Sequence, residues 1–124
     1  MILDTNALSA IVDGDANIAK VLPPERLAIP VIVLGEFQFG VEQSRRRDRY
    51  VQWLSEQLSD YEILEITATS ARYYAEIRLE SKQNGKPIPS NDVWIAALCR
   101  QHNMPILSRD RHFDVVKGLQ RIVW

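Results

Sequence analysis

Short aliphatic and β-branched runs alternate with segments of helical spacing along the whole chain, and this alternation limits the fold more than any other feature. Strand-like runs occur at Ile2-Leu3 and at residues 27–29, 62–66, 105–107 and 121–124. Each run is separated from the next by residues with helix signals. Strands that alternate with helices predict an α/β fold with a mainly parallel central sheet flanked by helices.

Helix boundaries follow from capping residues and prolines. Thr67 is placed to cap a long helix that ends at Asn84-Gly85, and either Ser90 or Asn91 is placed to cap the next one. The expected helices cover residues 5–11, 15–22 before Pro23-Pro24, 30–43, 50–58, 68–83 and 90–102.

Length and composition fit one domain over residues 1–124. No stretch is long and apolar enough to predict a membrane span, and the amino terminus lacks the features of a signal peptide. Cys99 is the only cysteine, which excludes an intrachain disulfide and a zinc cluster built on several thiolates. The reducing cytoplasm is therefore the simplest expected location.

Two acidic residues follow predicted strands. Asp4 comes directly after Ile2-Leu3, and Asp110 follows residues 105–107 after a short link. In parallel sheets, sites form outside the carboxyl ends of the strands, so we expect both carboxylates at one sheet edge. The alternative is that each acid caps a helix or turn, and Asp114 is left open as a substitute for Asp110.

Two more acids lie on predicted helices. Glu36 has apolar neighbours one turn away, and a carboxylate on an apolar face is costly to bury without a cation. Its alternative is a solvent-facing position or an arginine partner. Asp92 leads the apolar stripe of Ile95, Ala96 and Cys99, although a negative charge in a first helical turn is also favoured by the helix dipole.

Gathered together, four carboxylates repel one another unless a cation neutralises them. Oxygen-only ligand sets suit Mg²⁺ or Mn²⁺, which keep several waters and bind substrate phosphates through the rest of their shell. The arginine run at residues 45–47 and 49 has two interpretations. It is either a basic patch for a polyanion or, as the run alone favours, a solvated helix start.

Four segments resemble the PIN-domain family, particularly the VapC-like toxins of bacterial toxin–antitoxin pairs. They are Leu3-Asp4-Thr5-Asn6, Gly35-Glu36-Phe37 with Gly40, Gly85-Lys86-Pro87-Ile88 leading to Asp92 and Ile95-Ala96-Ala97, and the run Leu107-Ser108-Arg109-Asp110-Arg111-His112-Phe113. The resemblance covers nearly the whole chain in the same order.

This resemblance implies a PIN-like three-layer fold and hydrolysis of RNA phosphodiesters with Mg²⁺ or Mn²⁺. Asp4 and Asp92 would contact the metal directly or through water. Glu36 would orient or deprotonate the attacking water, and Asp110 would hold a second cation or an outer water. Hydrogen bonds to waters or phosphate would come from three neutral side chains, Thr5, Asn6 and Ser108.

The resemblance also implies a homodimer and an antitoxin whose segment blocks the acidic pocket. Apolar residues on several sides of one helix favour such an interface, namely Val31, Leu34, Phe37 and Phe39. His112 is a lesser candidate for a second-shell or RNA-contact role. Tyr50 and Trp53 fit the core or a subunit interface better than base stacking.

Three other functions remain open at this point. A haloacid-dehalogenase-like phosphatase would use Asp4 as nucleophile, but that chemistry usually needs a second aspartate where Asn6 stands. A catalytically inactive binding module would use the acids only as caps. A DNA nuclease would share the metal site and differ in its substrate.

Overall fold

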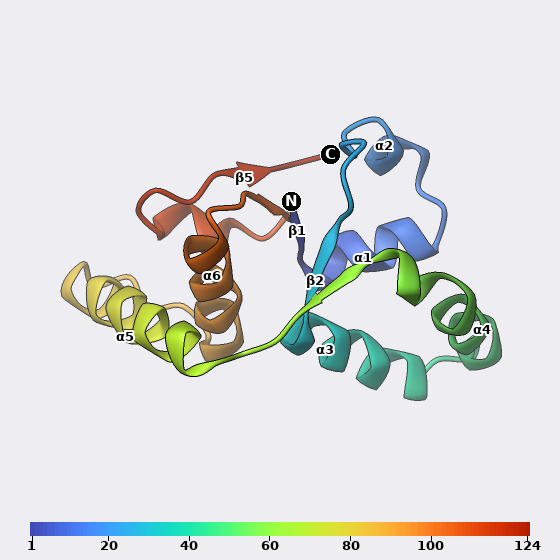
Figure 1. Cartoon of the computed structure of the whole chain (residues 1–124), viewed down its shortest axis with the longest axis horizontal. Helices are drawn as coiled ribbons and strands as arrows, with labels where there is room; N and C mark the ends of the chain where they lie inside the picture. Colours follow the sequence, from blue (N-terminus) through green and yellow to red (C-terminus); the bar gives the residue numbers. More distant parts are fainter.

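The structure is a computed structural model that describes residues 1–124, and its centre is a five-stranded sheet with helices on both sides (Figure 1). The elements, in chain order, are β1 (Ile2–Leu3), α1 (Thr5–Val12), α2 (Ala16–Ala19), β2 (Ala28–Pro30), α3 (Val31–Glu42), α4 (Arg47–Gln57), the 3-10 helix η1 (Leu58–Asp60), β3 (Glu62–Leu64), α5 (Ala68–Gln83), α6 (Ser90–His102), β4 (Ile106–Leu107), the 3-10 helix η2 (Arg111–Val115) and β5 (Arg121–Ile122).

All strand pairs are parallel, in the order β3-β2-β1-β4-β5. The chain therefore adds strands on one side of β1 before it returns to the other side with β4. Ile2 pairs with both Ala28 and Ile106, so β1 occupies the middle of the sheet. The carboxyl ends of β1 and β4 lie next to each other at the point where the strand order reverses, which is where α/β sheets place their sites.

Helices α5 and α6 pack together on one side of the molecule, and α1, α3 and α4 lie together on the other side (Figure 1). Arg100 of α6 joins the first pair, because its guanidinium donates to both carboxylate oxygens of Glu80 at 3.0 Å. Ser70 Oγ of α5 also donates to Gln101 Oε1 at 2.6 Å. No helix is long and apolar enough to cross a membrane.

The parallel sheet and flanking helices predicted from the sequence are confirmed, and three details were wrong. Helix α2 ends at Ala19 rather than at residue 22. Helix α6 has Pro89 as its N-cap instead of Ser90 or Asn91, and no side chain caps it. Helix α4 begins at Arg47 rather than at residue 50. Thr67 caps α5 as expected, in a reciprocal capping box with Ser70.

Phe113 anchors η2 to the core and is fully buried. Its neighbours Asp110 and His112 contribute to the site described below. Replacing Phe113 with alanine should lower the free energy of unfolding by about 3–5 kcal/mol, because a cavity replaces a buried ring. Chemical denaturation measures the change. The control Leu79→Ala, on an exposed position of α5, should change stability by no more than about 0.5 kcal/mol. Equal effects of the two variants would contradict this packing role.

Candidate metal and catalytic site

Asp4 lies at the carboxyl end of β1 and is almost entirely buried, with 5% of its surface exposed. Its backbone N–H donates to the carbonyl of Leu107, which ends the neighbouring strand β4. The pairing of β1 with β4 thus brings Asp4 beside Ser108, a residue 104 positions later in the chain.

Three donors hold the Asp4 carboxylate. Ser108 Oγ donates to Oδ2 at 2.6 Å, Asn6 Nδ2 donates to the same oxygen at 3.1 Å, and the Thr5 N–H donates to Oδ1 at 2.8 Å. Asp4 is also the N-cap of α1. It is therefore both a carboxylate at the sheet edge and a helix cap, the two interpretations that the sequence allowed. A buried carboxylate that accepts several hydrogen bonds is held in one orientation.

Asn6 and Ser108 connect Asp4 to the loop after β4. Asn6 Oδ1 accepts from the N–H of Arg109 at 3.1 Å, and Ser108 Oγ accepts from the N–H of Asp110 at 2.9 Å. The loop that carries Asp110 is therefore fixed to the end of β1 by neutral side chains. Ser108 is fully buried, which matches a positioning role more closely than contact with a large substrate.

Asp92, Asp110 and His112 form a second part of the site. His112 Nδ1 lies 3.1 Å from an oxygen of Asp92 and 3.1 Å from an oxygen of Asp110. One potential ligand atom of each residue lies within 4.8 Å of the others. Asp92 comes from the first turn of α6, whereas Asp110 caps η2 and accepts from the N–H of His112 at 2.9 Å.

The pKa of Asp92 is raised to about 6, first by burial and then by the negative charge of Asp110. Asp4 adds a further repulsion, while the hydrogen bond from His112 works in the opposite direction. The pKa of His112 is also raised, chiefly by its hydrogen bond to Asp92. Two carboxylates and an imidazole therefore lie close together, at a place where a cation is electrostatically favoured.

Glu36 on α3 is exposed, and this differs from the apolar surroundings expected from the sequence. Its pKa is raised, first by partial burial of the carboxylate and then by repulsion from Asp4. Hydrogen bonds from Thr5, at 3.4 Å, and from Asn91 oppose this shift. The carboxylate faces Asp4 across an opening to solvent.

All four predicted acids thus lie at one edge of the sheet, although only Asp92 and Asp110 approach within ligand distance of a common centre. Asp114 does not substitute for Asp110, because Arg121 donates to both of its oxygens at 2.7 and 2.9 Å. Trp94 stacks on Tyr74 with ring centroids 4.1 Å apart, so it packs toward α5 and leaves the site open.

His112 takes a larger part in the site than the sequence indicated. The turn at Asp110 orients its ring toward Asp92, 20 positions earlier. The available signal was local: an aspartate two residues before a histidine favours a turn in which the aspartate caps the histidine N–H. The contact of the His112 ring with Asp92 depends on tertiary packing, and no sequence pattern predicts it.

The residues present fit a divalent cation. Carboxylate oxygens suit Mg²⁺ and Mn²⁺, and an imidazole adds a donor that Mn²⁺ tolerates. The raised pKa of Asp92 indicates negative charge that the protein's own groups leave incompletely balanced. The acidic cluster is therefore able to hold a metal ion.

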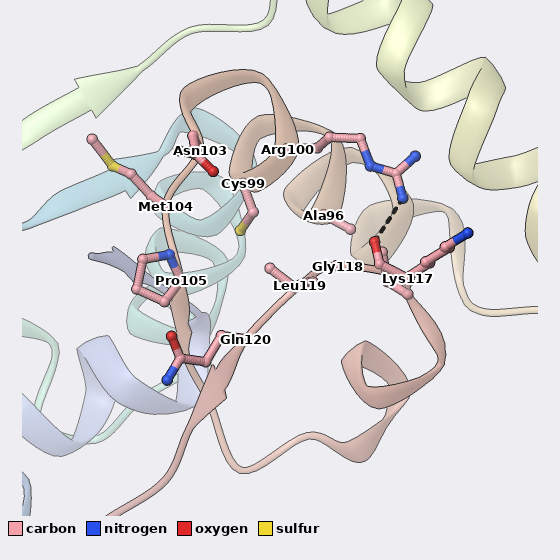
Figure 2. A pocket seen from close by; sticks show the side chains of 11 residues that line it. Ala96, Cys99, Arg100, Asn103, Met104, Pro105, Lys117, Gly118, Leu119 and Gln120 are labelled. Atoms are coloured by element: carbon pink, nitrogen blue, oxygen red, sulfur yellow. Dashed lines mark hydrogen bonds between the residues drawn. The ribbon is translucent and has the colours of Figure 1, made fainter.

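A separate cavity of about 250 Å³ lies at the other end of β4, next to Pro105. Figure 2 shows its lining, in which Arg100 donates to the carbonyl of Lys117 at 2.9 Å. None of the four acids lines this cavity. Its volume alone does not make it a candidate for metal chemistry.

Comparison with known proteins identifies the family of this chain. The PIN domain family model matches residues 1–119. Ribonuclease VapC2 of Rickettsia felis is 32% identical over 97% of this chain and 90% of its own length. Ribonuclease VapC5 of Mycobacterium tuberculosis is 30% identical over 94% of this chain and 87% of its own length.

Solved structures agree with the sequence matches. VapBC2 from Rickettsia felis, bound to a DNA fragment from its promoter, has a TM-score of 0.85 and 29% identity over 99% of this chain and 97% of that one. FitAcB from Neisseria gonorrhoeae has a TM-score of 0.86 and 25% identity over 98% of this chain and 95% of that one. With a family model covering almost all residues and relatives matched over nearly their full lengths, this chain belongs to the PIN domain family, as a VapC-like member.

Proposed function

We propose that the protein is a metal-dependent endoribonuclease, acting as the toxin of a toxin–antitoxin pair. The observation that carries the proposal is the set of acids at the carboxyl edge of β1 and β4, with Asp92 and Asp110 sharing one cation-favouring position. The VapC ribonuclease relatives support RNA as the substrate. One relative, from Shigella flexneri, is a tRNA(fMet)-specific endonuclease at 27% identity.

Asp4, Asp92 and Asp110 would hold Mg²⁺ or Mn²⁺, with His112 as a neighbour or an additional ligand. When bound, such an ion acidifies a coordinated water and offsets negative charge on the phosphodiester. Ser108 and Asn6 keep the Asp4 carboxylate in one orientation. This orientation is set before substrate arrives, which reduces the cost of organising the site during the reaction.

Glu36 would accept the proton of the attacking water. Its exposed carboxylate opens to solvent, and its raised pKa makes it a stronger base than an ordinary glutamate. Thr5 donates to Glu36 at 3.4 Å and lies on α1 directly after Asp4, so it links the proton acceptor to the buried carboxylate.

The structure also favours hydrolysis without a phosphoenzyme. Asn6 occupies the position where a phosphatase of the alternative class places its second aspartate, and its side chain is already engaged with Asp4, Ser108 and the N–H of Arg109. Both oxygens of Asp4 accept hydrogen bonds, and the residue is 5% exposed. Nucleophilic attack by Asp4 on a phosphate would require that network to open.

Purified protein should cleave end-labelled structured RNAs with Mg²⁺ or Mn²⁺, and chelator should stop the reaction. Asp4→Asn and Asp92→Asn should each lower the cleavage rate by at least about 100-fold, because each removes a charge from the cation site. The matched control is Asp114→Asn, which alters an acid paired with Arg121 and should retain cleavage.

Full activity of both variants, or cleavage that continues in chelator, would contradict the proposal. Preparations must first be freed of any co-purified antitoxin. Competition with single-stranded DNA of the same sequence separates a ribonuclease from a DNA nuclease. A covalent phosphoenzyme would instead favour the phosphatase alternative.

Metal-free protein should lose stability as pH rises because of Asp92. Its carboxyl ionises at about 6 in the folded state and near 3.8 when unfolded, so the folded state is penalised progressively above pH 4. His112 acts in the same direction, since its stabilising pairing is lost as it deprotonates. In chelator, Asp92→Asn should therefore be more stable than the wild type at pH 8 by about 1–3 kcal/mol.

The stability advantage of Asp92→Asn over the wild type should be smaller at pH 5. It should also fall when Mg²⁺ or Mn²⁺ is added to the wild type at pH 8. Thermal unfolding of both proteins in matched buffers gives the comparison, in which the contributions of other titrating groups largely cancel. A difference in stability that does not change with pH would contradict the assigned state of Asp92.

We also propose a homodimer formed through α3. Phe39 is 67% exposed and Val31 is 40% exposed, whereas Phe37 is buried and belongs to the core rather than to the outward set expected from the sequence. The exposed pair lines an open groove of about 460 Å³ together with Ile32, Gly35, Glu36 and Asn91, so the proposed interface borders the acid site. An apolar surface of this kind favours association with a second copy.

Replacing Val31 and Phe39 together with glutamine should convert a dimer to a monomer, because the apolar contact surface is lost. Light scattering after size-exclusion chromatography measures the mass in solution. Leu79→Gln, at an exposed apolar position on α5, is the control and should leave the mass unchanged. The same dimeric mass in the double variant would exclude this surface as the interface.

The complexes formed by structural relatives support a protein inhibitor for this chain. VapBC from Salmonella typhimurium and VapBC2 from Rickettsia felis were both solved on DNA. By analogy, we propose that a cognate antitoxin segment covers the acid site, and that the pair binds its promoter through the antitoxin.

A further inference from the structure

A groove leads away from the acid site between α1 and α3. It has a volume of about 220 Å³ and begins at Thr5 and Glu36, two residues that belong to the site. At its far end lie Ser44 and Tyr50, at the start of α4. Helices α1, α3 and α4 are neighbours on the same side of the molecule (Figure 1).

The two walls of the groove follow helical stripes. Thr5, Ser9 and Asp13 are spaced by four residues along α1 and its C-cap, and the lining residues of α3 have nearly the same spacing. The other wall consists of Glu36, Phe37, Gly40 and Val41 of α3, followed by Ser44 between α3 and α4. Eight residues at about 1.5 Å each give a groove roughly 12 Å long.

The groove is open to solvent, and its exposed surface is more apolar than polar, with Phe37 and Val41 along the α3 side. Thr5, Ser9 and Ser44 supply hydroxyl groups along it. A Cβ added at Gly40 would meet nothing within 4 Å, so the missing side chain leaves free space at the middle of the groove. Asp13 is the one acid at the far end, and it accepts the hydroxyl of Tyr50 at 2.9 Å.

Four arginines lie in the chain between Ser44 and Tyr50, the two residues at the far end of this groove. Arg47 is engaged by Glu42, with contacts of 3.1 and 3.2 Å. Arg45, Arg46 and Arg49 are exposed, and no carboxylate lies within ion-pair distance of them. Three cations without carboxylate partners, close in the chain to the end of the groove, favour an anion rather than structural ion pairs.

We propose that this groove holds a single strand of RNA and that Arg45, Arg46 and Arg49 bind its phosphates. The inference rests on the proposed ribonuclease function and adds the position of the substrate. A stacked strand carries one phosphate per about 3.4 Å, so 12 Å corresponds to three or four nucleotides between the cleaved bond and the arginines.

Charge favours RNA over a protein segment in this groove. An occupant must approach the cation of the acid site at one end and three free arginines at the other, and a phosphate backbone supplies negative charge at both. Hydroxyl groups along the walls match sugar and phosphate oxygens. Tyr50 lines the arginine end, where its ring packs edge-on against Phe37 with centroids 6.1 Å apart and its hydroxyl donates to Asp13.

Two variants test the groove by different means. The first replaces Arg45, Arg46 and Arg49 with glutamine. The second, Gly40→Gln, fills the groove from a helical position where no backbone strain arises. A third variant serves as a charge-matched control on and just after α5, with glutamine at Arg72, Lys82 and Lys86, all exposed and on the opposite side of the molecule.

The measurement is the binding of a fluorescein-labelled single-stranded RNA of mixed sequence, in Mg²⁺, by anisotropy at several salt concentrations. All proteins carry Asp92→Asn so that the probe stays intact. The arginine variant should bind at least about tenfold more weakly, and its salt dependence should fall by about 2 in log–log slope. Gly40→Gln should weaken binding comparably while retaining its thermal stability, and the α5 control should match the parent.

Unchanged affinity and salt slope in both groove variants would overturn the inference, and so would an equal loss in the α5 control. If the groove variants keep RNA affinity but lose inhibition by a protein antitoxin, the groove belongs to that partner and the RNA assignment is wrong. Cleavage by the wild type is followed in parallel. If the wild type cleaves RNA, the contradicting outcomes refute only the RNA-binding groove. If the wild type cleaves no RNA, both the ribonuclease proposal and the groove are refuted.

Discussion

The site depends on the parallel pairing of β1 with β4, because this pairing sets Asp4 next to Ser108. The hydrogen bond between them, at 2.6 Å, joins residues from opposite ends of the chain, and Asn6 reinforces it from the first turn of α1. Ser108 in turn accepts from the N–H of Asp110. The position of Asp110 is therefore fixed relative to the end of the first strand. A neutral network of this kind orients carboxylates without cancelling their charge.

The remaining negative charge explains why the edge can bind a cation. Burial raises the pKa of Asp92 to about 6, and Asp110 adds repulsion. His112 partly balances the pair in the metal-free protein, since its ring lies 3.1 Å from both carboxylates. A divalent ion that enters must compete with protons for Asp92 and His112, so metal binding and protonation are linked. Placed at the opening, Glu36 has the exposure that a proton acceptor for a solvent-derived nucleophile needs.

Sequence patterns predicted most of the fold because local signals and global topology agree here. Asp4 and Thr67 cap the helices that follow them, and the β1 and β4 runs are short, apolar and fully buried. The errors lie where tertiary contacts decide. Glu36 is exposed because α3 directs Val33, Phe37 and Val41 to the core instead. Asp114 is paired with Arg121 instead of facing the other acids. His112 contacts Asp92 because the buried Phe113 holds η2 against the core. None of these contacts leaves a periodic signal in the sequence.

The central claim is that the acids at the β1–β4 edge form one metal centre, and diffraction from crystals soaked in Mn²⁺ tests it most directly. Anomalous scattering locates the ion without reference to activity, substrate or inhibitor. The account predicts a strong peak among the carboxylates of Asp4, Asp92 and Asp110, in direct contact or through water, which is lost in Asp92→Asn crystals. A fully soaked crystal with no peak at this edge, or with Mn²⁺ only at unrelated surface acids, would contradict the account and reduce these residues to helix and turn caps.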